Sequence, residues 1–285
     1  MSFFGDLFKK SKTDAIYEVK SPNSRVVLTF MLDRGQISYY VKKDDKVIVR
    51  QSRLGIALKD AAPLADGFGI VRAYSRMVDD TWKAYWGEQH VIRNNYNETA
   101  IYREETERPS RLLTLRFRVY DDGVAFRYEI PAQPEMKNMV VSDELTEFAV
   151  DANSRSWSIP AYQPDRYEYE YIEHPVHALT DSVHTPLTIA TPTGYYISIH
   201  EAALYNYGAM TLKLNNGNLK SDITPLSDGM RAYVELPFST PWRTIIIGHD
   251  ALDLTTSRMI LNLNDAPRED FSWVEPTKFM GIWWA

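Results

Sequence analysis

One carboxylate stands where the residue pattern calls for an apolar side chain, and this makes it the first candidate for chemistry. Gly194 indicates a turn, and the residues after it alternate as in a β-strand. Ile197 and Ile199 face one side and His200 the other. If the strand continues by one residue, Glu201 joins the isoleucines, where it needs a metal ion, a basic partner or a water-lined cleft. If the strand stops at His200, Glu201 lies in a solvated loop.

A second group of polar and aromatic side chains lies in the segment 161–171, where tyrosines are interleaved with acidic residues. Period-two alternation would place Tyr167 and the other tyrosines on one face, with Glu168 and Glu170 on the opposite face. Such a segment is either a solvated edge strand or a loop that faces a ligand. The sequence alone leaves both interpretations open.

Three histidines suggest a metal site, because imidazole is the commonest metal ligand. His174 and His177 would need helical geometry to reach one ion, and Pro175 between them disfavours a helix. Neither this pair nor His184 has an acidic residue at a recognised zinc-site spacing. The pattern therefore argues against zinc.

The elements that must position these side chains are short strands. The clearest is a hairpin in which 113–119 and 124–130 alternate in one phase around an Asp-Asp-Gly turn. Polar turns at 33–35 and 43–46 separate three earlier strands, and only 250–257 suggests a helical turn or two. About twelve to sixteen short strands indicate an all-β protein, built as a large antiparallel β-sandwich.

Length and composition exclude several classes of function. The 285 residues allow one large all-β domain or two average domains. A net charge of −6 without a basic stripe argues against nucleic-acid binding, and the chain has no run of eighteen apolar residues that could cross a membrane. The absence of Cys excludes disulfides and a thiol nucleophile. The N-terminus lacks the apolar core of a secretory signal.

The last twenty residues differ from the rest of the chain. Residues 264–270 resemble a linker, and the apolar run 279–285 predicts a strand that is buried on both faces. Such a strand needs partners, so the chain is expected to be cut short where a second domain begins. The predicted organisation is a tail (1–15), a sandwich domain (16–265), and a linker with one strand (266–285).

A series of motifs occurs in order along the chain: Thr81–Trp82, Trp86–Glu88, Arg93–Glu98, Phe117–Glu129, Tyr167–Glu168, Thr185–Leu187, Ile199–Leu204, Ser272–Trp273 and Ile282–Trp284. Together they resemble the N-terminal part of glycoside hydrolase family ninety-seven, bacterial α-glucosidases and α-galactosidases of the starch-utilisation type. The resemblance covers residues 16–285. Each motif is weak alone, but the ordered set is specific.

The resemblance implies a galactose-mutarotase-like β-supersandwich packed against a catalytic (β/α)8 barrel, which this chain enters only at its first strand. The catalytic carboxylates belong to that barrel, so this chain is expected to contain no catalytic residue and to be inactive alone. Family members hold Ca²⁺ beside the scissile bond, with one ligand from the N-terminal domain. That role falls by motif position on Glu201, with Glu168 in reserve, and a hard cation would stabilise an inward carboxylate.

The resemblance also implies an oligosaccharide substrate, with Glu98, Tyr167 and Glu168 as sugar-binding residues and the barrel as partner. It implies a periplasmic or secreted protein. It leaves open whether the parent enzyme prefers glucosides or galactosides, and whether it inverts or retains. Two other functions remain: a free-standing carbohydrate-binding module that uses Trp82, Trp86 and the tyrosines of 162–171, or a scaffold for folding and assembly.

Overall fold

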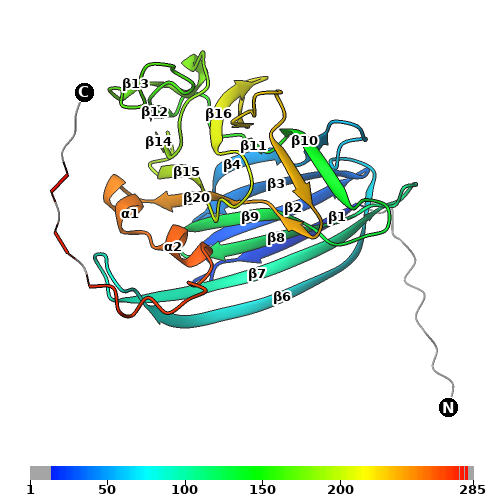
Figure 1. Ribbon diagram of the computed structural model, residues 1–285. Helices are drawn as coiled ribbons and strands as arrows, with labels where there is room; N and C mark the ends of the chain where they lie inside the picture. The colour runs from blue at the N-terminus through cyan, green and yellow to red at the C-terminus, as the bar shows by residue number, and fades with distance from the viewer. Residues whose placement is uncertain (1–13, 276, 279, 282–285) are drawn as a thin grey trace.

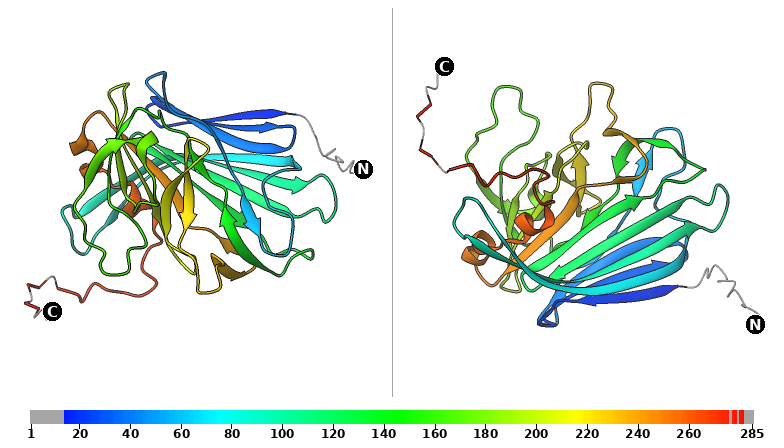
Figure 2. Two further views of the ribbon diagram at one scale, coloured as in Figure 1. Left: turned by 90° about the horizontal axis from the view of Figure 1, so that it is seen from above. Right: turned by 60° about the horizontal axis from the view of Figure 1, so that its bottom comes forward.

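The computed structural model of the protein describes residues 14–275, 277–278 and 280–281, and within them it is built almost entirely of antiparallel strands (Figure 1). Ten strands form one large sheet in the order β13-β12-β14-β15-β20-β9-β8-β7-β6, with β19 added beside β9. Four strands, β1 to β4, form a second sheet that lies over it, and two three-stranded sheets complete the molecule. Figure 2 shows the two large sheets as separate layers. The predicted all-β antiparallel sandwich is confirmed.

The elements have the following bounds: β1 Ala15–Lys20, β2 Val26–Asp33, β3 Gln36–Lys43, β4 Lys46–Arg53, β5 Ile56–Leu58, β6 Phe68–Lys83, β7 Val91–Glu105, β8 Leu112–Tyr120, β9 Gly123–Ile130, β10 Asn138–Glu144, β11 Glu147–Phe148, β12 Arg155–Ser158, β13 Ile172–Pro175, η1 Val176–Ala178, β14 Leu187–Ala190, β15 Tyr196–Ala202, β16 Met210–Asn215, β17 Asn218–Ile223, β18 Ala232–Glu235, β19 Phe238–Ser239, β20 Trp242–Gly248, α1 Ala251–Thr256 and α2 Met259–Leu263.

Aromatic rings join the two large sheets in the core. The ring centroid of Phe30 on β2 lies 5.8 Å from that of Phe117 on β8. Tyr39 on β3 lies 4.8 Å from Phe126 on β9. All four side chains are fully buried, and burying a side chain of this size contributes about 1.5–3 kcal/mol. The alternation predicted for the β8–β9 hairpin therefore supplies the inner face of the sandwich.

Of the other local predictions, two turns and a short helix are confirmed and an edge strand is wrong. The turns at 33–35 and 43–46 and the short helix near 250–257 are confirmed as the β2–β3 and β3–β4 turns and α1. The edge-strand interpretation of 161–171 is wrong, because this segment is a loop between β12 and β13. Tyr162 has a φ of 61° and Pro164 has no N–H to donate, so the backbone there cannot form a ladder. The segment is therefore a loop, and the expectation that this loop faces a ligand stays a prediction.

The C-terminal predictions concern residues that are partly outside the description. Phe279 and residues 282–285 of the predicted buried strand are not among the described residues. The division at 16–265 and 266–285 therefore stays a prediction. Within the described chain, the helices α1 and α2 have six and five residues, and no helix is long and apolar enough to span a membrane.

Candidate functional site

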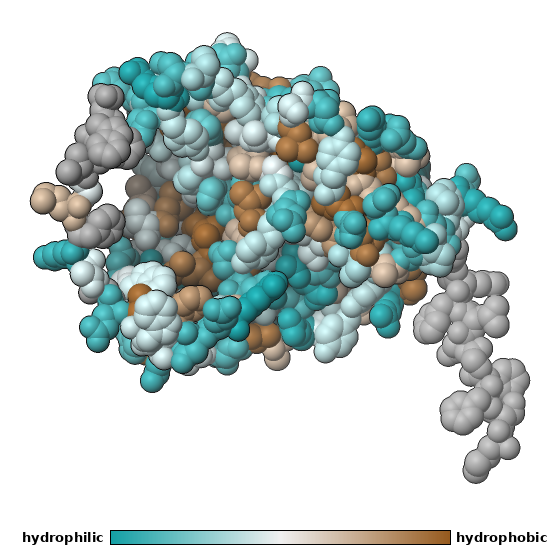
Figure 3. Space-filling model, viewed as in Figure 1, coloured by the Kyte–Doolittle hydropathy of each residue, from teal (hydrophilic) through white to brown (hydrophobic). Residues whose placement is uncertain are grey.

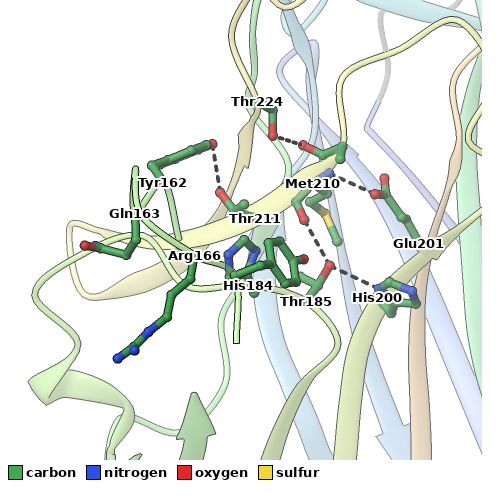
Figure 4. A pocket seen from close by; sticks show the side chains of 12 residues that line it. Tyr162, Gln163, Arg166, His184, Thr185, His200, Glu201, Met210, Thr211 and Thr224 are labelled. Atoms are coloured by element: carbon green, nitrogen blue, oxygen red, sulfur yellow. Dashed lines mark hydrogen bonds between the residues drawn. The ribbon is translucent and has the colours of Figure 1, made fainter. Parts of the chain in front are cut away.

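A cleft of about 410 Å³ opens beside the end of β15, where three of the predicted motifs converge. It receives side chains from the 161–171 loop, from the segment before β14, and from β15 and β16 (Figure 4). On the face drawn in Figure 3, apolar side chains gather in a hollow on the left side and also occur at several places among polar ones. The residues that line the cleft are Tyr162, Gln163, Arg166, Tyr167, His184, Thr185, His200, Glu201, Ala209, Met210, Thr211 and Thr224.

Glu201 reaches this cleft from the buried face of β15. The strand continues to Ala202, so Glu201 is in phase with Ile197 and Ile199, as the alternation predicts. Its side chain is only 7% exposed. Oε1 accepts a hydrogen bond from the Met210 N–H at 2.9 Å, and this bond ties β15 to β16. The solvated-loop interpretation of Glu201 is therefore wrong.

Glu201 also has a basic partner, which the pattern had left as one of three possibilities. Nη1 of Arg243 on β20 donates to Oε2 of Glu201 at 2.6 Å, across the strand pair that places these two residues opposite each other. Nε and Nη2 of Arg243 donate to the two carboxylate oxygens of Glu144 at 2.8 and 2.6 Å. Tyr207 donates its hydroxyl proton to Glu144 at 3.2 Å.

The trio Glu144–Arg243–Glu201 is a buried charge system with a net charge of −1. Glu144 and Arg243 are completely buried. Burial would lower the pKa of Arg243, but the two carboxylates hold it above its ordinary value. Burial likewise opposes ionisation of Glu144, yet Arg243 holds the pKa of that carboxyl below its ordinary value. Arg243 and Glu144 are therefore charged at neutral pH.

The trio fits a cation as one contributor among several. A carboxylate offers about four lone-pair sites, and the hydrogen bonds described above occupy two of those on Glu201. The uncompensated negative charge of the trio favours a cation in the adjoining cleft. Within the described residues, however, no group of three His, Asp or Glu side chains could hold a metal ion together. A set of three carboxylate or imidazole ligands that includes Glu201 would therefore need at least one from outside the described residues.

Hydrogen bonds also join β15, β16 and the segment before β14 at the cleft. The Thr185 hydroxyl donates to the Met210 carbonyl at 2.9 Å. His200 Nδ1 lies 3.0 Å from the same Thr185 oxygen (Figure 4). Burial holds the pKa of His200 below its ordinary value, with a smaller raising effect of Glu201. This wall of the cleft therefore carries a neutral imidazole next to a charged pair.

Tyr167 lines the cleft from the 161–171 loop. It is 60% exposed on the 161–171 loop, and its ring centroid is 4.1 Å from that of His184. Tyr162, from the same loop, is anchored by its hydroxyl, which lies 3.0 Å from that of Thr211. The loop thus presents the exposed ring of Tyr167, while Tyr162 in the same loop is held in place by its hydroxyl.

Glu98 and Glu168 are not brought to the cleft. Glu98 lies on β7, where Arg76, Arg116 and Arg118 each donate to its carboxylate at 2.8 Å. Burial would raise the pKa of Glu98, but bonds from Arg118 and Arg76 hold it below its ordinary value. Glu168 is exposed on the loop beside Tyr167 and does not line the cleft. The structure thus gives Glu98 the environment of a structural ion-pair centre.

The histidines outside the cleft have ordinary partners. His174 Nε2 lies 2.8 Å from the Ser158 hydroxyl, and His177 Nδ1 lies 2.9 Å from the Ala152 carbonyl. They do not converge on one point with an acidic residue in the described chain.

Stability is expected to fall on mild acidification because of the cleft histidines. Burial holds the pKa of His200 and of His184 below the ordinary value of 6.5, so the unfolded chain binds protons first as the pH falls. Unfolding is then favoured increasingly from about pH 6.5 toward pH 5. Urea denaturation across this range should show a smaller slope for His200→Gln. The exposed His177→Gln serves as the control and should keep the original slope.

Sequence reasoning missed Arg243, Glu144 and Tyr207 as functional neighbours of Glu201. The available signal was an arginine at the head of the apolar run 243–248, which calls for a buried acidic partner. Glu144 is 99 residues away from Arg243 along the chain, so no local pattern could pair them.

The chain is similar to several known proteins. A family model described as Glycosyl-hydrolase 97 N-terminal matches residues 19–266. The chain is 25% identical over 277 residues to a probable retaining alpha-galactosidase of Streptomyces bingchenggensis. It is 20% identical over 302 residues to a retaining alpha-galactosidase of Bacteroides thetaiotaomicron. These alignments cover 95% and 94% of this chain, but only 42% and 44% of the two proteins.

Solved structures give the same picture. A Glycoside Hydrolase Family 97 enzyme from Pseudoalteromonas sp., in complex with acarbose, is 37% identical with a TM-score of 0.87. The same enzyme in complex with panose is 36% identical, also with a TM-score of 0.87. Each match covers 91% of this chain and 40% of the enzyme. A beta-arabinopyranosidase shares the fold, with a TM-score of 0.75 and 21% identity over 82% of this chain and 40% of its own.

Proposed function

Because this chain belongs to the Glycosyl-hydrolase 97 N-terminal family, we propose that it forms one wall of the sugar site of an α-glycosidase and supplies one Ca²⁺ ligand, Glu201. The chain spans less than half the length of the relatives described above, so the hydrolytic activity itself is assigned to a catalytic barrel beyond this domain. The proposed substrates are α-linked oligosaccharides of glucose or galactose.

The convergence at the cleft is the observation that carries this proposal. Tyr167, Thr185 and Glu201 belong to three separate motifs of the family resemblance, and all three line one cavity. Each comes from a different element, so the fold alone brings them together. A concave site that joins an exposed aromatic ring to a few fixed polar groups is typical of small-ligand binding.

The residues of this chain would bind and orient a sugar rather than break a bond. Tyr167 offers an aromatic face on which a sugar ring can stack, and the hydroxyls and the imidazole of the cleft offer hydrogen bonds. Glu201 would be one Ca²⁺ ligand, held by Arg243 and the Met210 N–H. When bound, Ca²⁺ supplies positive charge that can stabilise developing negative charge on oxygen.

The proposal is tested first on the chain as it stands. We expect negligible turnover of aryl α-glucosides and aryl α-galactosides by the 285-residue chain. We expect hydrolysis once the chain is joined to the barrel of a family 97 relative. Turnover by the chain alone would refute the assignment of the chemistry to the barrel.

Glu201→Gln tests the calcium role in the same chimera. Glutamine keeps an oxygen for the Met210 N–H but removes the charge, so Ca²⁺ affinity is expected to fall by at least about 10–100-fold. The measurement is the Ca²⁺ concentration that restores hydrolysis after treatment with a chelator. Glu168→Gln, the exposed reserve candidate, is the matched control. Equal loss in both variants, or in neither, would contradict the assignment to Glu201.

A carbohydrate-binding module is the second candidate function, and one feature favours it. Tyr85 and Trp86, in the β6–β7 loop, are 42% and 60% exposed with ring centroids 6.2 Å apart. Such rings can stack on sugar faces without a barrel. Calorimetry of panose and melibiose with the isolated chain separates the two functions. Affinity that is lost in Trp86→Ala but kept in Tyr167→Ala would favour the module.

A bacterial origin and a periplasmic or secreted location complete the proposal. Both are supported by the family and by relatives from Streptomyces, Bacteroides and Pseudoalteromonas. Fractionation of the native cells with an antibody against the chain tests the location. Recovery only with cytoplasmic markers would contradict it.

A further inference from the structure

Thr185 determines which nitrogen of His200 carries the proton. The Thr185 hydroxyl has a single proton, and it donates this proton to the Met210 carbonyl at 2.9 Å, because a carbonyl oxygen can only accept. The Thr185 oxygen must then accept in its 3.0 Å contact with His200 Nδ1. The neutral imidazole of His200 is therefore protonated on Nδ1, and Nε2 keeps its lone pair.

The lone pair on Nε2 is available to accept a hydrogen bond from a ligand in the cleft. His200 lines the cavity, and its hydrogen bond to the protein runs from Nδ1. Within the described residues, Nε2 has no hydrogen-bond partner. It is also not one of the fully buried polar atoms that lack a partner, so it is accessible to solvent. The ring is thus held at one nitrogen and open at the other.

An imidazole is mostly uncharged at pH 7, because its ordinary pKa is about 6.5. Arg166 and His184 line the same cleft, and burial lowers the pKa of His184. At neutral pH the cleft therefore presents Nε2 as an uncharged hydrogen-bond acceptor.

We propose that His200 accepts a hydrogen bond through Nε2 from a hydroxyl group of the ligand in the cleft, with Thr185 as the residue that positions the ring for this. The inference rests on the proposed function, since the hydroxyl donors of a glycosidase ligand belong to a sugar. A calcium ion is not the partner of Nε2, because Ca²⁺ takes oxygen ligands. His200 thus selects sugars that direct an O–H toward it.

The first arm of the test reads the tautomer directly. In the 285-residue chain labelled with ¹⁵N-histidine, long-range ¹H–¹⁵N correlation at pH 7 should give a pyrrole-type Nδ1 and a pyridine-type Nε2 for His200. Thr185→Val removes the acceptor and should shift the population toward the Nε2–H tautomer. Thr185→Ser keeps the hydroxyl and should preserve the original spectrum. An Nε2–H tautomer or a mixture in the unmodified chain overturns the inference.

The second arm adds panose and, separately, melibiose to the same labelled chain. Saturation with either sugar should move the Nε2 resonance of His200 toward the hydrogen-bonded range, while Nδ1 stays in place. The Met210 amide, which bonds to Glu201, is an independent reporter of cleft occupancy.

The two reporters separate two kinds of failure. If the sugars move the Met210 amide and leave Nε2 unchanged, the role of His200 is overturned and the proposed function stands. If neither sugar moves any cleft resonance, the role of His200 in this chain is overturned, whereas the proposed function is judged by hydrolysis in the chimera. His200→Phe, which keeps a ring of similar shape, should weaken the binding of the sugar that moves Nε2 by about tenfold.

Discussion

Replacement of Arg243 by methionine is expected to lower the free energy of unfolding by about 3–5 kcal/mol. Arg243 is completely buried and forms its ion pairs with Glu144 and Glu201 at 2.6 Å each. Methionine fills much of the same volume but leaves two buried carboxylates without a cation. The loss therefore comes from uncompensated charge rather than from a cavity. Urea denaturation followed by tryptophan fluorescence measures it.

A matched control separates burial from ion pairing as such. Arg155 pairs with Glu173 at 3.2 Å, but the two side chains are 57% and 47% exposed. Solvent screens such a pair, so Arg155→Met should cost less than about 1 kcal/mol. Adding Glu144→Gln to Arg243→Met should recover part of the loss, because one of the stranded charges is removed. Equal destabilisation by both arginine variants, or no recovery in the double variant, would contradict this account.

The trio also explains why one glutamate can have a structural and a binding role. Glu201 completes the hydrogen bonding of β16 through Met210 and balances part of the charge on Arg243. Together these two contacts leave some of the lone pairs on the Glu201 carboxylate oxygens unoccupied. The carboxylate is thus fixed in orientation before any ligand arrives, which is the preorganisation that a binding site requires.

The sequence could predict what depends on neighbouring residues. The strand phase of 197–201 depends on adjacent side chains, and so it indicated the buried face for Glu201 in the case where the strand continues past His200, which is the case observed. The β8–β9 hairpin was equally accessible, because its turn and both alternating strands are contiguous. The motif order led to the family, and three of its motifs meet at the cleft. These predictions all use information within about twenty residues or an ordered comparison along the chain.

What could not be predicted depends on contacts between distant elements. Whether the segment 161–171 forms a strand or a loop depends on whether a neighbouring strand is available to pair with it. The alternation of tyrosines carries no information about such a neighbour. β6 runs for 16 residues as an edge strand with mostly exposed side chains, so it lacks the apolar alternation that would mark its length. Glu98 was read as a sugar ligand, although its three arginines come from β6 and β8. A carboxylate in a motif carries no local sign of such partners.

A second large effect on stability is expected on the face of β20 opposite to Arg243. Trp242 is 1% exposed and packs with Met259 and Leu263 of α2. The guanidinium groups of Arg118 and Arg127 lie 4.7 and 4.4 Å from its ring centroid. Trp242→Ala is expected to lower the free energy of unfolding by about 3–5 kcal/mol, because a large cavity opens and both stacked arginines lose their ring.

The location of the damage distinguishes Trp242 from Arg243, although the two are adjacent. Successive side chains of a strand face opposite sides, so Trp242 supports α2 whereas Arg243 supports the cleft. In Trp242→Ala, the Asn262 amide of α2 should exchange hydrogen faster than the global loss of stability explains. In Arg243→Met, the Met210 amide should show that excess instead. Trp86→Ala, at an exposed tryptophan, should cost less than about 1 kcal/mol and change neither amide. If both buried variants accelerate the same amide, β20 does not separate the two sides of the sheet, and the positioning role assigned to Arg243 fails with it.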